Sequence, residues 1–341
     1  MRHNSLRGNM NYLKIISLLG VLFMWSCGNK ATQFSLPSTS QSFDQVVTYN
    51  NKVDLLFVVD NSKSMGQYQV KLSTQVPNLI STLNNLKMDY HVAVTTTTMT
   101  TDALKYPMTR QLIGSPKYLT NQNIQLLSKR LLVGESGSDN ERGLDALAYV
   151  TGDYAQTEAS GFLRSSALFV VIFLADENDN SSEFGKGNSS DFVDLMNKLK
   201  PAFSDGNRAW IANYIGNISS VGCDILGGDT SIGTSYLKLV EASHGIKESI
   251  CSADLSVAVS NIKARFIDQL TSFRLKDAPN KDSIYIEVGG ISVNEDSNNG
   301  WTLETEIDGK GITGYYIKFH GSAIPAVDQS INVKYTPAGA N

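Results

Sequence analysis

The sequence has few of the features that mark several common protein classes. It contains three cysteines and four histidines in 341 residues, with no Cys-x-x-Cys pair, so a structural zinc site is not indicated. Basic and acidic residues nearly balance, 29 against 33, which leaves no basic excess for nucleic acid. No apolar run reaches the ~20 residues of a transmembrane helix. Phosphate-loop, nucleophile-elbow and zinc-protease motifs are absent, so we expect no enzyme.

The front of the chain is typical of a secretory signal. Basic residues precede an almost wholly apolar run over 15–25, and Ser26 and Cys27 follow it. Residues 24–28, Met-Trp-Ser-Cys-Gly, resemble the lipobox of bacterial lipoproteins, in which the cysteine becomes the first residue and carries the lipid. The resemblance implies a signal peptide over 1–26, lipid on Cys27 and, without an acidic residue after it, an outer-membrane lipoprotein of the bacterial cell envelope. An ordinary secretory signal with an incidental cysteine is the alternative.

Export also bears on the next segment and on the other two cysteines. Residues 27–49 are rich in serine, threonine and glutamine, a composition that favours a flexible tether. An exported protein folds in an oxidising compartment, where cysteines pair. We therefore expect a disulfide between Cys223 and Cys251, with two buried thiols as the alternative.

After the tether, the sequence alternates apolar strands with amphipathic helices. The near-continuous apolar runs 53–59 and 167–175 are typical of strands covered on both faces. Apolar residues from Val70 to Leu86 have mostly helical spacing, which predicts a helix over 69–87 with a kink at Pro77. Further strands are expected at 90–94 and 210–215, and further helices at 123–132, 143–154, 192–199, 235–243 and 255–270. The alternation predicts an α/β fold with a doubly wound, mostly parallel sheet over 50–272.

The last segment, residues 273–341, has a different pattern. Short β-type runs separated by turn-rich pieces predict a small antiparallel β module. These runs cover 283–288, 301–306, 315–320 and 331–335. Residues 309–314 satisfy G-x-G-x-x-G, but a polar stretch precedes them and a strand follows, so we expect a hairpin turn rather than a nucleotide site.

Polar side chains follow the two strongest strands directly. Asp60, Ser62 and Ser64 come after the first, and Asp176 comes after the second. In doubly wound sheets, ligands bind at the carboxyl ends of strands where the strand order reverses. Carboxylate and hydroxyl oxygens suit a hard cation such as Mg²⁺. The same residue types are also common in turns and helix caps, and in that role they need no metal.

The first of these segments carries a family resemblance. A strand followed by Asp60-x-Ser62-x-Ser64, then a helix, a second strand and Asp176, resembles the von Willebrand factor A domain and its metal-ion-dependent adhesion site. In that family two serines and a threonine bind the metal through hydroxyls, and two aspartates bind it through water or as a further ligand. One position stays open for an acidic group of the partner. The resemblance covers roughly 50–272 and implies Mg²⁺, or Mn²⁺ or Ca²⁺, at these residues.

The third corner of that site departs from the family pattern. The family's threonine motif, Thr-x-Thr-Gly-x-Ala-Leu, aligns its leucine on Leu144, which puts Ser138 at the threonine position. Serine keeps the hydroxyl, so Ser138 is the expected ligand. Asp139 or Glu141 would instead supply a carboxylate and change the net charge at the metal.

These features lead to a functional hypothesis. We expect a lipid-anchored envelope protein that binds, through its cation, a carboxylate on a protein or cell-surface partner. It would contact the membrane through the lipid and would not bind nucleic acid. A structural or assembly module with a vestigial metal site is the alternative, supported by Ser138 in place of threonine. A metal-dependent hydrolase on the same fold would need a base near Asp176, for which Asp179 is the obvious candidate.

Overall fold

The computed structural model describes residues 43–48, 51–185, 188–203, 206–220, 231–307, 312–326 and 329–339. The predicted signal peptide, Cys27 and Cys223 lie outside these ranges. Cys251 is disulfide-bonded, and its pairing with Cys223 stays a prediction. None of the described helices is long and apolar enough to cross a membrane.

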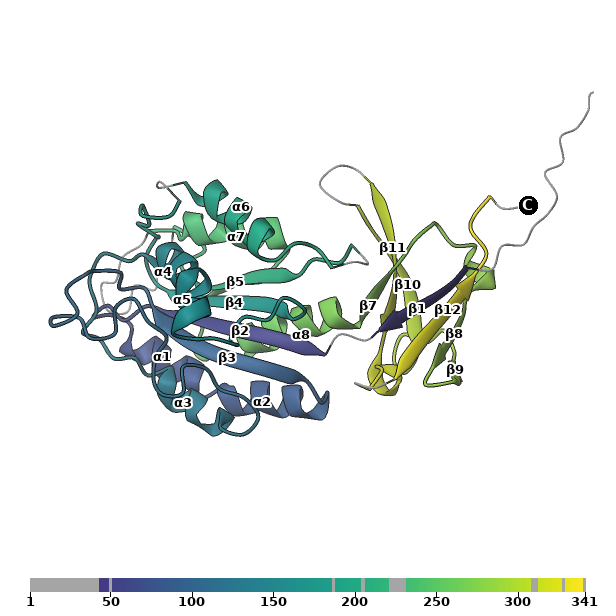
Figure 1. Cartoon of the computed structure of the whole chain (residues 1–341), viewed down its shortest axis with the longest axis horizontal. Coiled ribbons are helices and arrows are strands. Elements are labelled where there is room, and N and C mark those ends of the chain that lie inside the picture. Colours follow the sequence, from purple (N-terminus) through teal and green to yellow (C-terminus); the bar gives the residue numbers. More distant parts are fainter. Residues whose placement is uncertain are drawn as a thin grey trace, which may run out of the picture. The chain divides into compact units, whose positions relative to one another are not determined.

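A five-stranded sheet with helices on both faces forms the α/β domain (Figure 1). Its strands are β2 (Lys52–Val59), β3 (Asp89–Thr96), β4 (Leu168–Ala175), β5 (Trp210–Gly216) and β6 (Lys247–Ser249). Its helices are α1 (Gly66–Ser73), α2 (Val76–Asn85), α3 (Leu127–Arg130), α4 (Gly143–Thr151), α5 (Asp153–Thr157), α6 (Ser189–Leu199), α7 (Thr234–Ser243) and α8 (Ser256–Thr271), with a 3-10 turn η1 (Ile124–Leu126) before α3. Every strand pair in this sheet is parallel, which confirms the predicted fold class.

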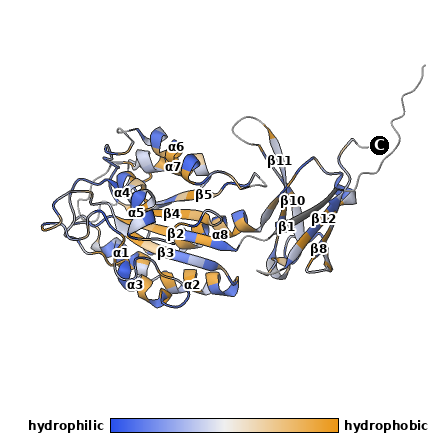
Figure 2. Ribbon diagram, in the orientation of Figure 1, coloured by the Kyte–Doolittle hydropathy of each residue, from blue (hydrophilic) through white to orange (hydrophobic). Residues whose placement is uncertain are grey.

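The central strand β2 is buried on both faces, as its continuous apolar sequence predicts. Leu55 and Phe57 pack in one core with side chains of α1, α2 and α8. Leu56 and Val58 point the other way and pack with α4, α6 and α7. Figure 2 shows the apolar strands between the two helical layers.

The predicted helix over 69–87 is two helices. α1 ends at Ser73 and α2 begins at Val76, with Pro77 in the first turn of α2. Proline has no N–H to donate, and the first turn of a helix needs none, so Pro77 starts a new helix instead of kinking a continuous one. The predicted helix over 143–154 is likewise divided into α4 and α5 at Gly152.

The strand order of the sheet is β3-β2-β4-β5-β6. The chain runs from β2 outward to β3 and then crosses back to β4 on the other side of β2. The order thus reverses between β2 and β4, and the loops after these two strands part in opposite directions. In doubly wound sheets such a reversal leaves a crevice at the carboxyl ends of the strands, where ligands bind.

The β module consists of two antiparallel sheets, with strand orders β1-β12-β8-β9 and β10-β11-β7. The strands are β1 (Phe43–Thr48), β7 (Ser272–Leu275), β8 (Tyr285–Val288), β9 (Ile291–Val293), β10 (Trp301–Ile307), β11 (Thr313–Phe319) and β12 (Ser330–Tyr335), with 3-10 turns η2 (Lys281–Ser283) and η3 (Gly321–Ala323). Residues 43–48 differ from the expected tether, since β1 pairs with β12 from Phe43 opposite Tyr335 to Thr48 opposite Ser330. The β-branched residues at 46–48 favour a strand.

Candidate metal centre

The two predicted aspartates meet where the strand order reverses. Strands β2 and β4 are parallel neighbours, with Val59 opposite Leu174. The backbone amide of Asp60 donates to the Leu174 carbonyl at 2.9 Å. Asp60 and Asp176 therefore begin adjacent loops at the same edge of the sheet, and both are buried.

In the turn after β2, one carboxylate oxygen of Asp60 accepts a backbone hydrogen bond and the other makes no well-formed hydrogen bond. Asp60 Oδ1 accepts the Ser62 backbone amide at 2.7 Å, the side-chain turn typical of Asx residues. Asp60 Oδ2 and Ser62 Oγ are buried and make no well-formed hydrogen bond. Ser64, half-buried, follows in the same turn, where the Met65 amide donates to the Ser62 carbonyl at 3.2 Å.

Glu141 is a third carboxylate at this edge and is 0% exposed. Burial raises the pKa of Glu141 to about 10, the charge on Asp60 adds to the rise, and the nearby Thr97 hydroxyl opposes it. Burial likewise raises the pKa of Asp60 to about 7, with the Ser62 amide opposing the rise and the charge on Asp176 adding to it. Carboxylates that share a buried site hold their protons more tightly, because each charge disfavours the next.

The three candidates for the third corner take different places. The Ser138 amide donates to Thr98 Oγ1 at 3.0 Å, and its own hydroxyl accepts the Asn140 amide at 3.1 Å. Asp139 is exposed. Of the three candidates, Glu141 is the one whose side chain interacts with Asp60. Ser138 as a metal ligand stays a prediction.

A buried glutamine, which the sequence analysis missed, supports Asp60 from behind. Gln69 Nε2 donates to the Asp60 carbonyl at 2.9 Å and to the Gly134 carbonyl at 2.8 Å. Gln69 Oε1 in turn accepts the Gly134 amide at 3.0 Å. Helix α1 thereby ties the turn after β2 to the loop that leads to Glu141.

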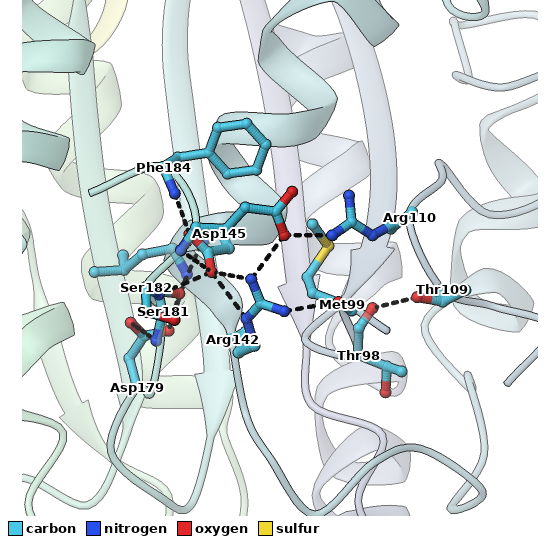
Figure 3. Close-up of polar contacts among 12 residues, drawn as sticks. Thr98, Met99, Thr109, Arg110, Arg142, Asp145, Asp179, Ser181, Ser182 and Phe184 are labelled. Atoms are coloured by element: carbon cyan, nitrogen blue, oxygen red, sulfur yellow. Dashed lines mark hydrogen bonds and ion pairs between the residues drawn. The ribbon is translucent and has the colours of Figure 1, made fainter. Parts of the chain in front are cut away.

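Asp145, in the first turn of α4, anchors the loop that follows Asp176 (Figure 3). Its carboxylate accepts three backbone amides at 3.0 to 3.2 Å, from Ser182, Glu183 and Phe184. Arg142 Nε donates to Asp145 Oδ2 at 2.9 Å, and Arg142 Nη1 donates to the Met99 carbonyl at 2.8 Å. Glu183 pairs with both Arg142 and Arg110. One charge network therefore holds together the three loops that border the centre.

Both carboxylate oxygens of Asp179 already accept hydrogen bonds, which leaves this side chain poorly placed to act as a general base. Its Oδ1 accepts the Leu144 amide at 3.0 Å and the Ser181 hydroxyl at 2.9 Å, and its Oδ2 accepts the Ser181 amide at 3.1 Å. Burial raises the pKa of Asp179 to about 6, which these hydrogen bonds oppose. In the hydrolase alternative Asp179 would be the base, but in the structure its carboxylate caps the first turn of α4.

The oxygens at this edge match the ligands of a hard divalent cation. Asp60 Oδ2, Ser62 Oγ, Thr97 Oγ1 and both Glu141 carboxylate oxygens are buried without a well-formed hydrogen bond. Buried polar atoms are nearly always satisfied, so this cluster of oxygens calls for an explanation, of which a bound ion is one. Within the described ranges, no three His, Cys, Asp or Glu side chains stand together as a metal-ligand group. Hydroxyl oxygens would therefore have to complete the set.

The strand order, together with Asp-x-Ser-x-Ser at the end of β2 and an aspartate at the end of β4, decides the fold type. This is a von Willebrand factor A fold. No protein-family model matches the sequence of the chain, and no curated protein matches it. The name A domain is used below for its α/β domain.

Several solved structures resemble the chain at low sequence identity. Proximal thread matrix protein 1 from the mussel byssus, with a zinc-occupied MIDAS motif, aligns at 14% identity and a TM-score of 0.37, over 65% of this chain and 48% of that one. The pilus adhesin SpaC from Lactobacillus rhamnosus GG aligns at 13% and 0.40, over 85% and 39%. The ArnB paralog VWA2 from Sulfolobus acidocaldarius aligns at 12% and 0.31, over 86% and 59%. The chain spans less than two thirds of each, and these values carry no function from them to it.

Proposed function

We propose that the A domain binds a carboxylate of a protein or cell-surface partner through a divalent cation, Mg²⁺ in the first place. Asp60, Ser62, Ser64 and Asp176 would hold the cation, with Glu141 or Ser138 completing the set. The observation that carries the proposal is the cluster of buried oxygens without hydrogen bonds at Asp60, Ser62 and Glu141. A cation bound there supplies a positive charge, and a coordination position left to solvent would accept the partner's carboxylate.

A vestigial metal site remains the second candidate, favoured by one observation. The Ser138 hydroxyl already accepts the Asn140 amide, so the residue at the threonine position is in use as a local cap. This candidate predicts a partner interaction that survives EDTA, whereas the cation proposal predicts one that EDTA abolishes.

Mg²⁺ is expected to raise the melting temperature of the purified mature protein by about 5 °C or more at saturation, because a ligand that binds only the folded state stabilises it. Differential scanning fluorimetry with Mg²⁺ and with EDTA measures the shift. Asp60→Ala should abolish the response, while Asp153→Ala, at an exposed aspartate of α5, should keep it. An equal melting temperature in Mg²⁺ and EDTA for the unaltered protein would sink the cation proposal.

We further propose that Cys27 carries lipid and anchors the protein at the outer membrane of the cell envelope, on the strength of the lipobox resemblance at 24–28. Multiple acyl chains hold a protein firmly, whereas one holds it marginally. Cys27→Ser should therefore move the protein from the membrane fraction to the soluble periplasmic fraction. Retention of the variant in the membrane fraction after a salt wash would contradict the anchor.

A further inference from the structure

An uncharged pocket of ≈ 350 Å³ lies beside the candidate centre. Its lining includes Asn61, Thr98, Tyr106, Met108, Leu132 and Val133. No residue of the lining carries a charge, and most of the lining surface is apolar. The volume is near the lower end of the range for ligand pockets, about 300 to 1,000 Å³, so the pocket suits a small apolar group.

Two chain segments join this pocket to the centre. Asn61, in the lining, directly follows Asp60, and Thr98, also in the lining, directly follows Thr97. Thr98 Oγ1 donates to Asn61 Oδ1 at 2.8 Å, so the two segments are bonded together at the pocket. Consecutive Cα atoms are about 3.8 Å apart. Two lining residues of the pocket are therefore the direct chain neighbours of Asp60 and Thr97.

Hydrogen bonds fix the walls of the pocket before any ligand enters. The Thr109 hydroxyl donates to the Thr98 carbonyl at 3.1 Å and to the Thr100 carbonyl at 2.7 Å. The Thr96 hydroxyl donates to the Met108 carbonyl at 3.2 Å. On the opposite wall, Gly134 is held by the buried Gln69. A preformed pocket costs less ordering on binding than a flexible one.

The loops around the pocket expose apolar side chains. Leu132, in the lining, is 46% exposed, and Leu104, two residues before Tyr106 on the same loop, is 100% exposed. Both leucines are accessible to a partner that approaches the pocket.

We propose that this pocket receives an apolar side chain of a protein partner, one or two residues from the acidic residue that reaches the centre. The inference rests on the proposed function, because the acidic residue has to engage the cation. In an extended peptide, adjacent Cα atoms lie about 3.8 Å apart and alternate side chains share a face about 7 Å apart. These short spacings suit a pocket whose lining includes the residues that follow Asp60 and Thr97. An uncharged, mostly apolar lining surface favours a hydrocarbon side chain over a second acid.

A displayed library of random linear peptides, selected on the mature protein in Mg²⁺ and eluted with EDTA, tests the proposal. The expected sequences contain Asp or Glu with Leu, Met, Phe or another apolar residue one or two positions away. Enrichment of acidic peptides without a neighbouring apolar residue would overturn the pocket assignment. Failure to enrich any peptide, together with Mg²⁺-dependent binding of a polyuronate, would overturn it in favour of a polysaccharide partner.

A substitution at the mouth of the pocket then tests whether the selected peptides bind there. Leu132→Lys places a charge at the mouth and should weaken binding of the selected fluorescent peptide about tenfold or more in anisotropy titrations, because burial of an apolar side chain contributes at least that much. Leu126→Lys, at a leucine 38% exposed and outside the lining, is the matched control and should bind as the unaltered protein does. Equal weakening by both variants, or by neither, would overturn the assignment.

The Mg²⁺ melting shift of Leu132→Lys separates the two proposals. If the shift persists while the peptide affinity falls, both proposals stand. If the shift persists and the affinity is unchanged, the pocket proposal fails alone. If the unaltered protein shows no Mg²⁺ shift, the cation proposal fails and the pocket proposal falls with it.

Discussion

Replacing Asp145 by alanine is expected to lower the free energy of unfolding by about 4 kcal/mol. The carboxylate is 0% exposed and accepts the amides of Ser182, Glu183 and Phe184, so the substitution leaves three part-buried hydrogen bonds without their acceptor. It also removes one of the two ion-pair partners of Arg142, which then keeps only Glu183. Urea denaturation at pH 7 measures the loss.

Acid should reproduce part of this effect. Burial raises the pKa of Asp145. The amides of Phe184, Glu183 and Ser182 and the Arg142 guanidinium outweigh burial, so the pKa is lowered overall. A lowered pKa in the folded state means that the stabilisation is present above the unfolded-state pKa and is lost as pH falls through the folded-state value.

Asp194→Ala, at an exposed aspartate of α6, is the control for Asp145→Ala and should change stability by less than about 0.5 kcal/mol. A loss below about 1 kcal/mol for Asp145→Ala would show that the network does not anchor its loop.

The metal-free protein is expected to lose a few kcal/mol of stability as pH rises from 4 to 8, and Mg²⁺ is expected to cancel most of that loss. The pKa of Asp60 is raised from 3.8 to about 7. The stabilisation from the retained proton is therefore complete below the unfolded-state pKa and is lost as pH rises through about 7. One pKa unit corresponds to about 1.4 kcal/mol. Glu141, with its pKa raised to about 10, extends the loss to higher pH.

A bound cation takes the place of these protons, so Mg²⁺ affinity should rise with pH. Melting temperatures at pH 4, 6 and 8, in EDTA and in Mg²⁺, give both profiles. Asp60→Asn should reduce the fall in the EDTA profile, to which Glu141 still contributes, and should remove the Mg²⁺ response, while Asp194→Asn should leave both unchanged. A metal-free protein whose melting temperature does not fall over this range would contradict the raised pKa of Asp60, and a fall that Mg²⁺ leaves intact would contradict cation binding.

The parts of the centre that lie at strand ends could be predicted from the sequence. The runs 53–59 and 167–175 are continuous and apolar because both faces of β2 and β4 are covered, and such runs end where the chain leaves the core. Asp60 and Asp176 follow these ends directly. Their meeting then depends only on the reversal of strand order between β2 and β4, which the alternation of strands and helices already predicts.

The parts that depend on long-range loop contacts could not be predicted. The helical spacing made Val70 an inward-facing residue, yet Val70 is 53% exposed and Gln69 is buried. The carbonyls of Asp60 and Gly134 need hydrogen-bond donors. Gln69 supplies them, so the buried face of α1 includes this polar residue. A glutamine inside an amphipathic helix is a weak signal of this, because most such residues face water.

The third corner depends on a close approach that no motif alignment contains. The Gly137 amide donates to the Asn61 carbonyl at 2.7 Å, and a Cβ atom at Gly137 would lie 2.5 Å from Asn61 atoms. Glycine therefore lets this loop settle directly on the turn after β2. The alignment puts Ser138 at the threonine position, and its role as a ligand stays a prediction, while the interaction of Glu141 with Asp60 comes from the structure alone.

The pairing of β1 with β12 has a consequence for the time at which the protein completes its fold. Strand β1 lies at the edge of its described sheet with β12 as its neighbour, and Phe43 stands opposite Tyr335. Almost the whole chain separates these partners, and contacts of such long sequence separation form late. The A domain lies between them in the sequence and holds its own sheet, so it can fold before the end of the chain is available. The β module has to wait for the final strand, and a chain cut short before Ser330 would leave β1 with no strand to close against.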